Sequence, residues 1–143
     1  MDMEKIVFEY TDLDGEYAIE SAWAQRVEGN YILDNILFYA PGYSWGDIVS
    51  VEERNGLLYV TGLIKESGHS TIRIIFYNKE IIQLTTEQLE KRGCRWEGSN
   101  IPTLISVDIA PEIDYIPIRK FLDEGEENDW WSYEESCLAH NIE

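Results

Sequence analysis

The stretch DIVSVEERNGLLYVTGLI, residues 47–64, decides the first part of the fold. It holds two strand-like runs on either side of Asn55-Gly56, and this dipeptide is the strongest short-range signal for a tight type I′ hairpin turn. A second and longer turn at 67–70 leads into another strand-like run at 71–77. The sequence therefore predicts three consecutive antiparallel strands over residues 47–77.

The segments before this hairpin extend the same pattern. Residues 6–10 form a short apolar run, and residues 17–27 alternate with the period of a half-buried strand. Residues 31–38 form a further extended piece after the break at Gly29-Asn30. The first 80 residues thus predict an antiparallel β-meander or small barrel of five to six strands.

The pattern becomes helical after residue 80. Residues 84–92 follow helical spacing, with Thr85 or Thr86 as the expected N-terminal cap and Gly93 as the expected C-terminal stop. Residues 103–109 predict a strand.

A second helix is expected to follow that strand. Pro117 suits the first turn of a helix, and Gly125 is expected to end it. We therefore expect an α+β fold in a single domain, residues 1–143. Its mainly β part would cover 1–80, and a β-α-β-α ferredoxin-like half with an acidic aromatic tail would cover 81–143.

The chain is strongly acidic. It carries 28 Asp and Glu against 11 Lys and Arg, a formal net charge of −17 over 143 residues, and no basic residue follows Lys120. Repulsion between these like charges destabilises a compact state. We therefore expect that a basic partner offsets the charge, or that the charge is kept because it improves solubility. The 44% hydrophobic and 13% aromatic content excludes a wholly disordered acidic chain.

The same charge balance disfavours two classes of partner. The longest basic grouping, Lys91-Arg92 with Arg95, is too short to neutralise a nucleic-acid backbone. An anionic membrane surface would repel the chain, and no apolar run approaches the roughly 18 residues that span a bilayer. The N-terminus is acidic where a secretory signal would be basic, so we expect a cytoplasmic protein.

Metal and cofactor sites find little support. Cys94 and Cys137 are too few for a disulfide framework and too isolated for a metal site. His69 and His140 lack a second ligand at helical or hairpin spacing, and the acidic run 123–129 lacks the ligand spacing of a calcium loop. We expect no metal and no cofactor.

The C-terminal segment mixes acidic and aromatic side chains, which leaves two interpretations open. Its aromatic residues could pin the C-terminus onto the sheet by burial. They could instead be exposed anchors in an acidic rim, the composition that suits a cationic protein surface. On the second interpretation the partner-binding residues are Asp123, Glu124, Glu126, Glu127, Asp129, Trp130, Trp131, Tyr133, Glu134 and Glu135.

A different set of candidates lies in the turns. Ser67 and His69, with a nearby carboxylate, could supply a nucleophile and its base, although neighbouring side chains on a tight turn rarely reach each other. Trp45 could form a stacking wall beside Asp47, or Asp47 could cap an Asx turn. The alternative hypothesis is therefore a pocket formed by Trp23, Trp45, Asp47, Ser67 and His69.

Five segments carry a resemblance to a known family. They are 20–24 (ESAWA), 43–49 (YSWGDIV), 66–73 (ESGHSTIR), 92–94 (RGC) and 131–135 (WSYEE). In this order the chain resembles the bacterial family of domains of unknown function DUF4265. The resemblance implies no established activity, so it assigns no catalytic residue.

Composition and motifs together favour a non-enzymatic acidic binding protein. Small acidic domains without a catalytic set resemble immunity proteins, which neutralise a cognate bacterial toxin by covering its basic active-site surface. The competing hypothesis is a small-molecule-binding or enzymatic domain with its pocket near Trp45, Asp47 and His69. A third is a regulatory or scaffold domain that binds another cytoplasmic protein.

Overall fold

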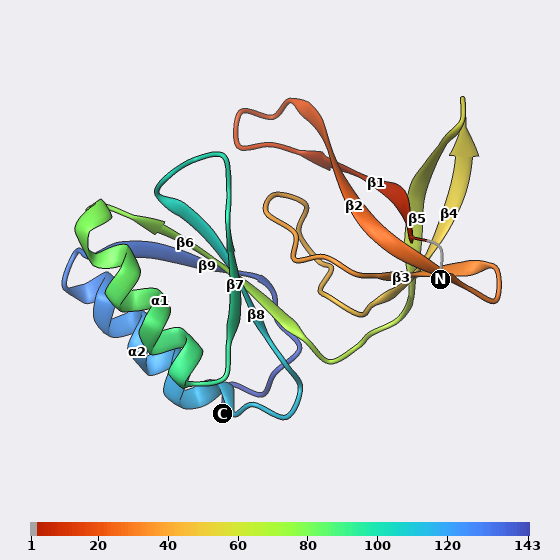
Figure 1. Cartoon of the computed structure of the whole chain (residues 1–143). Coiled ribbons are helices and arrows are strands. Elements are labelled where there is room, and N and C mark those ends of the chain that lie inside the picture. The colour runs from red at the N-terminus through yellow and green to blue at the C-terminus, as the bar shows by residue number, and fades with distance from the viewer. Residues whose placement is uncertain (1–2) are drawn as a thin grey trace.

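A computed structural model describes residues 3–143 and places them in two β-sheets that lie side by side (Figure 1). The elements in chain order are β1 (Met3–Thr11), β2 (Tyr17–Val27), β3 (Asn30–Leu33), β4 (Ile48–Arg54), β5 (Leu57–Lys65), β6 (Ser70–Phe76), η1 (Lys79–Ile81), α1 (Ile82–Lys91), β7 (Arg95–Gly98), β8 (Leu104–Ile109), α2 (Tyr115–Glu127) and β9 (Trp131–Cys137). Within the described residues, no helix is both long and apolar enough to cross a membrane.

Strands β1 to β5 close into a small barrel, as the N-terminal turn signals predict. Neighbouring strands are antiparallel, and a short parallel pairing of β1 with β5 closes the ring. Asn55 and Gly56 both have positive φ, at 53° and 84°, as a type I′ turn requires. The barrel buries its own core of nine residues: Ile6, Phe8, Ala22, Ala24, Tyr31, Leu33, Leu37, Ala40 and Val49.

The second sheet has the order β7-β8-β6-β9, and every neighbouring pair is antiparallel. Helices α1 and α2 cover one of its faces (Figure 1). The core between them consists of Ile72, Ile74, Phe76, Leu89, Cys94, Ile105, Val107, Ile109, Tyr115, Ile118, Leu122 and Trp131. This sheet has its own hydrophobic core, separate from that of the barrel.

The predicted β-α-β-α arrangement of the second half is wrong, because it lacks two of the strands. The run 71–77 begins the second sheet as β6 and does not extend the barrel, and two further strands, β7 and β9, complete a β-α-β-β-α-β order. Both missed strands are short or polar edge strands, so they lack the apolar alternation from which a strand is recognised. The expected acidic aromatic tail is therefore divided between the end of helix α2, up to Glu127, and strand β9, from Trp131.

Two helix boundaries also differ from expectation. Helix α1 begins at Ile82, after a short 3-10 turn capped by Asn78, and the hydroxyls of Thr85 and Thr86 donate to backbone carbonyls four and three residues earlier. Gly93 does follow its C-terminus with φ +87°, as predicted. Helix α2 continues two residues beyond Gly125. This glycine does not end the helix; it leaves room for the ring of Trp131, which packs against it.

The predicted extended segment 31–38 is mostly a loop. Strand β3 ends at Leu33, and residues 34–47 then lie against the helix-free face of the second sheet. The Ser106 hydroxyl donates to the carbonyl of Leu37 at 2.7 Å, and Arg73 donates to the carbonyl of Phe38. This loop therefore joins the barrel to the second sheet.

A single carboxylate shapes the joining loop. Glu20 of β2 accepts hydrogen bonds from the backbone N–H groups of Phe38, Tyr39 and Ala40, at 2.7, 3.0 and 2.9 Å. Three charge-assisted bonds to consecutive amides fix the loop's path. Glu20 thus positions the surface that the barrel presents to the second sheet.

Candidate functional site

Four of the five predicted pocket residues meet between the barrel and the second sheet. Asp47 is buried and accepts from the backbone N–H groups of Ser44 and Ser67, both at 2.9 Å. The Ser67 hydroxyl donates to the carbonyl of Trp45 at 2.7 Å and accepts from the N–H of His69 at 3.1 Å. Asp47 and Ser67 therefore hold two loops together.

His69 continues this group into the second sheet. Its Nδ1 lies 2.9 Å from Oδ1 of Asp108, a residue of β8 that is only 2% exposed. Burial raises the pKa of the Asp108 carboxyl, and the neighbouring His69 partly offsets that rise. The ring of Trp45 lies beside His69 and 4.8 Å from the guanidinium carbon of Arg95.

Asp108 is the member of this group that sequence reasoning missed. It stands in a strand whose side chains are all buried, and its polar neighbour two positions earlier is Ser106. Polar residues at alternate positions of an otherwise apolar strand mark a second, polar packing face, and this was the available signal.

These residues form a junction that connects the barrel to the second sheet, and they are not a nucleophile hydrogen-bonded to its base. The Ser67 hydroxyl donates its hydrogen to a backbone carbonyl, so that hydrogen is not shared with the imidazole of His69. Trp23, the fifth predicted residue, does not join the group. It lies on the outer surface of β2, where the Lys5 ammonium sits 4.9 Å from its ring centroid.

The two tryptophans of the C-terminal segment have different environments. Trp131 is 1% exposed and packs between Phe76 and Phe121, while its Nε1 donates to the carbonyl of Leu122 at 3.0 Å. A Cβ at Gly125 would come within 1.9 Å of the Trp131 ring, so glycine is needed beneath it. Trp130 is 44% exposed. The burial interpretation holds for Trp131, and only Trp130 remains available to a partner.

Some acidic residues of the C-terminal segment are bonded to other side chains, and others are exposed without an ion pair in the described part of the chain. Glu134 pairs with Arg73 at 2.7 Å, and Glu135 accepts from the Tyr115 hydroxyl at 2.6 Å. Asp123 accepts from the hydroxyl of Tyr133. The exposed acids Glu124, Glu127 and Asp129 at the end of α2 form no ion pair within residues 3–143.

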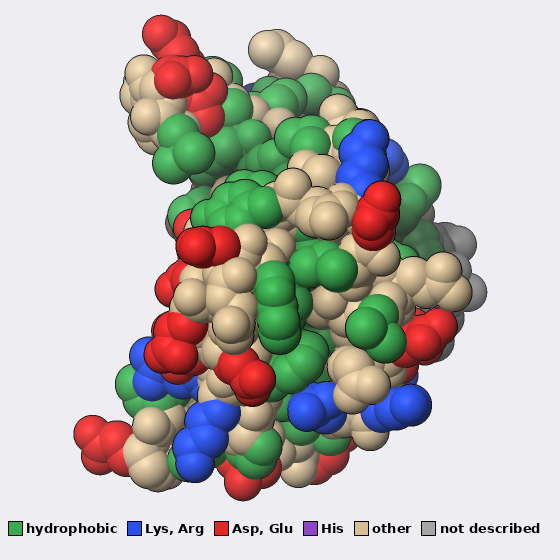
Figure 2. All heavy atoms as spheres, turned by 90° about the vertical axis from the view of Figure 1, so that its left-hand side faces the viewer, with side chains coloured by type: hydrophobic (Ala, Val, Ile, Leu, Met, Phe, Trp, Pro, Cys, Tyr) green, Lys and Arg blue, Asp and Glu red, His purple; other side chains and the backbone are tan. Residues whose placement is uncertain are grey.

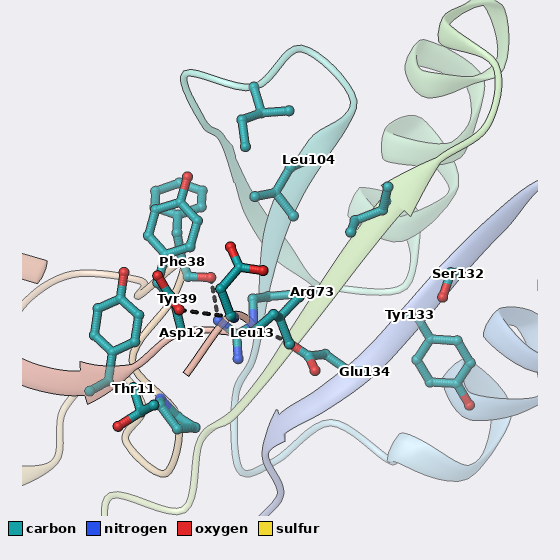
Figure 3. A pocket seen from close by; sticks show the side chains of 15 residues that line it. Thr11, Asp12, Leu13, Phe38, Tyr39, Arg73, Leu104, Ser132, Tyr133 and Glu134 are labelled. Atoms are coloured by element: carbon teal, nitrogen blue, oxygen red, sulfur yellow. Dashed lines mark hydrogen bonds and ion pairs between the residues drawn. The ribbon is translucent and has the colours of Figure 1, made fainter. Parts of the chain in front are cut away.

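A cavity of about 690 Å³ opens between the β1–β2 hairpin and the helix-free face of the second sheet (Figure 3). Leu13 and Asp12 reach it from the hairpin, and Phe38 and Tyr39 reach it from the joining loop. Arg73 lies at its centre, between Phe38 and Glu134 (Figure 3). We call this cavity the hairpin groove. Sequence reasoning missed it because its walls come from segments that are far apart in the chain.

The comparisons with known proteins agree with this fold. The family model for the domain of unknown function DUF4265 matches residues 20–133. A solved structure described as a novel crystal structure of a hypothetical protein from Neisseria gonorrhoeae is 26% identical, with a TM-score of 0.86 over 99% of each chain. No curated protein matches the chain.

Proposed function

The chain belongs to the DUF4265 family, and we propose that it is a non-enzymatic acidic binding protein whose partner presents a basic surface. The observation that carries the proposal is uncompensated negative charge. Within residues 3–143, five acidic residues pair with arginines, namely Glu4, Glu9, Glu52, Glu134 and Glu135, of the 28 acidic residues in the chain. Most of the excess therefore faces solvent or a partner.

Two acidic surfaces support the proposal. The first is the end of α2, where Glu124, Glu127 and Asp129 are exposed next to the half-exposed Trp130. The second is the tip of the β1–β2 hairpin, with Asp12 and Asp14. Figure 2 shows hydrophobic side chains exposed between acidic ones on one face of the molecule. Charge would steer a basic partner, and exposed apolar groups would hold it after contact.

The specific case that we propose is an immunity protein. Its partner would be a toxin domain with a basic active-site surface, and the acidic end of α2 with Trp130 would cover that surface. Trp131 and Glu135 support α2 from inside the fold, because their side chains bond to residues of that helix, whereas the exposed Glu134 pairs with Arg73 in the hairpin groove.

Charge reversal tests the proposal. We expect the change of Glu124, Glu127 and Asp129 to lysine to weaken the binding of the basic partner captured from the native host, more strongly at low salt. A matched control reverses Glu28, Glu53 and Glu66, which are also exposed but lie on the barrel side, so that both variants have the same net charge.

The comparison of the two variants shows whether binding depends on the acidic end of α2 or only on the net charge of the chain. Equal weakening in both variants would mean that only net charge matters. Capture of an acidic partner, or binding that does not respond to salt, would contradict the proposal. In the immunity case, co-expression of the native chain should also protect cells from a toxin encoded beside it, and the reversal should remove that protection.

The competing ligand-binding or enzymatic function rests on one observation, the buried Asp108 that orients the ring of His69 at 2.9 Å. Carboxylates orient catalytic histidines in this way. His69→Gln separates the two roles: a junction role lowers the melting temperature and leaves partner binding unchanged. A ligand role would show as lost ligand binding or activity at unchanged melting temperature.

A further inference from the structure

We infer that the hairpin groove is the docking site for an extended peptide segment of the partner, one that carries an apolar side chain beside a lysine or arginine. This inference rests on the proposed function and assigns it a second contact site, distinct from the acidic end of α2. The supporting observations are the size of the groove, its uncovered apolar side chains, its charge and the rigidity of its aromatic lining.

The groove has the size and lining of a recognition site. At about 690 Å³ it falls in the range of cavities that bind small ligands or a few side chains. One wall is the β1–β2 hairpin and the other is the helix-free face of the second sheet. Figure 2 shows the surface hollowed beneath a projecting acidic tip.

Apolar side chains in this groove stay uncovered. Leu13 is fully exposed at the hairpin tip, and Ile75 and Ile101 on the opposite wall are 50% and 44% exposed. Turn tips are normally polar, so a fully exposed leucine there has no local structural reason. Clustered exposed apolar groups in a soluble chain mark an interaction site.

The charge of the groove selects a cationic occupant. Its charged lining residues are Asp12, Asp14, Glu134 and Arg73, three acids and one base, which sum to −2. Arg73 is already paired with Glu134 at 2.7 Å and bonded to the carbonyl of Phe38. Asp12 and Asp14 pair with no Lys or Arg within residues 3–143. An anionic ligand would be repelled, whereas a lysine or arginine would meet the acids of the hairpin.

The joining loop also lines the groove, and its aromatic residues are held in place before binding. Glu20 fixes the backbone of Phe38 and Tyr39, and the ring of Tyr39 stacks on that of Tyr10 with centroids 6.4 Å apart and planes 9° apart. The Tyr39 hydroxyl also donates to Asn100 at 3.1 Å. A preformed aromatic wall lowers the entropic cost of binding a flexible peptide.

The experiment titrates the ¹⁵N-labelled full chain with the peptide acetyl-Gly-Lys-Leu-Leu-Lys-Gly-amide and follows amide chemical shifts. Two control peptides replace both lysines by glutamate or both leucines by serine. We expect the lysine–leucine peptide to shift the amide signals of Leu13, Ile75 and Ile101, and each control peptide to bind at least about tenfold more weakly, since a favourable charge or apolar contact contributes on this scale.

Two variants make the test specific. Ile75→Thr with Ile101→Ser removes apolar surface while keeping exposed positions exposed, and it should weaken peptide binding about tenfold or more. Ile64→Thr is the matched control, because Ile64 is similarly exposed on β5 outside the groove, and it should leave binding unchanged.

The outcomes separate this inference from the proposed function. Shifts confined to the end of α2, with no effect of the Ile75 and Ile101 changes, would overturn the groove assignment and leave the acidic binding function standing. Absence of binding at millimolar peptide would overturn the groove assignment as well. Equal binding of the glutamate peptide would overturn the charge argument on which both rest.

Discussion

Replacing each of the two adjacent tryptophans by alanine tests the assignment of core and surface at the C-terminus. Trp131 is 1% exposed, contacts Phe76 and Phe121 at ring-centroid distances of 5.8 and 5.5 Å, and donates one hydrogen bond to a helix carbonyl. Truncation of a buried tryptophan costs about 3–5 kcal/mol, a large part of the ~5–15 kcal/mol stability of a typical domain.

Trp130→Ala is the internal comparison. This side chain is 44% exposed, so its truncation removes roughly half as much buried area as the truncation of Trp131. The cost in stability should be about 1–2 kcal/mol. For a chain of this length we expect Trp131→Ala to lower the melting temperature by on the order of 10 °C, and Trp130→Ala by a few degrees.

Urea and thermal unfolding of both variants give the measurement. Equal destabilisation by the two changes, or a loss below about 1 kcal/mol for Trp131→Ala, would refute the assignment of Trp131 to the core. Partner binding completes the comparison. Only Trp130→Ala should weaken binding beyond what its smaller loss of stability explains, because only that ring is accessible.

Three further outcomes are expected. Gly125→Ala should destabilise the chain by about 1–3 kcal/mol, since the added Cβ would meet the Trp131 ring; a neutral effect in urea unfolding would show that the ring can move. Burial raises the pKa of Cys94 to about 11, so its thiol should resist alkylation at pH 8, and the free energy of unfolding should fall between about pH 9 and 11, where the unfolded thiol ionises first; Cys94→Ala should reduce that fall and leave the part that Cys137, Tyr115 and Tyr133 contribute, because burial raises their pKa values as well. Glu20→Gln should loosen the joining loop and speed amide exchange at Phe38 and Tyr39; unchanged exchange rates would contradict the anchoring role of the carboxylate.

Local signals in the sequence predict the barrel well. Asn55-Gly56 specifies its turn by backbone geometry, and the alternation over 17–27 coincides with strand β2. The second half is harder to predict from such signals, because β7 is only four residues long and β9 pairs with β6, a strand that is distant in the chain. Gly125 illustrates the limit: a glycine near a helix end predicts a stop, whereas here its role depends on Trp131 of another element.

The candidate sites show the same division. Four turn residues are recognisable in the sequence and are brought together by the fold: Trp45, Asp47, Ser67 and His69. Asp108, the partner of His69, lies in a buried strand 39 residues further along the chain. The hairpin groove has no sequence signature. It depends on how far the β1–β2 hairpin extends over the second sheet, which is a property of the packing of two separate cores.

The central claim is that the acidic end of α2 binds a basic protein surface. Its most direct test is the association rate of the captured basic partner, measured by stopped flow from low to high salt, with the native chain and with the Glu124, Glu127 and Asp129 reversal. The native rate should fall steeply with salt, and the reversal should slow association at low salt and flatten the dependence. Equal rates for both chains at every salt concentration would contradict the claim.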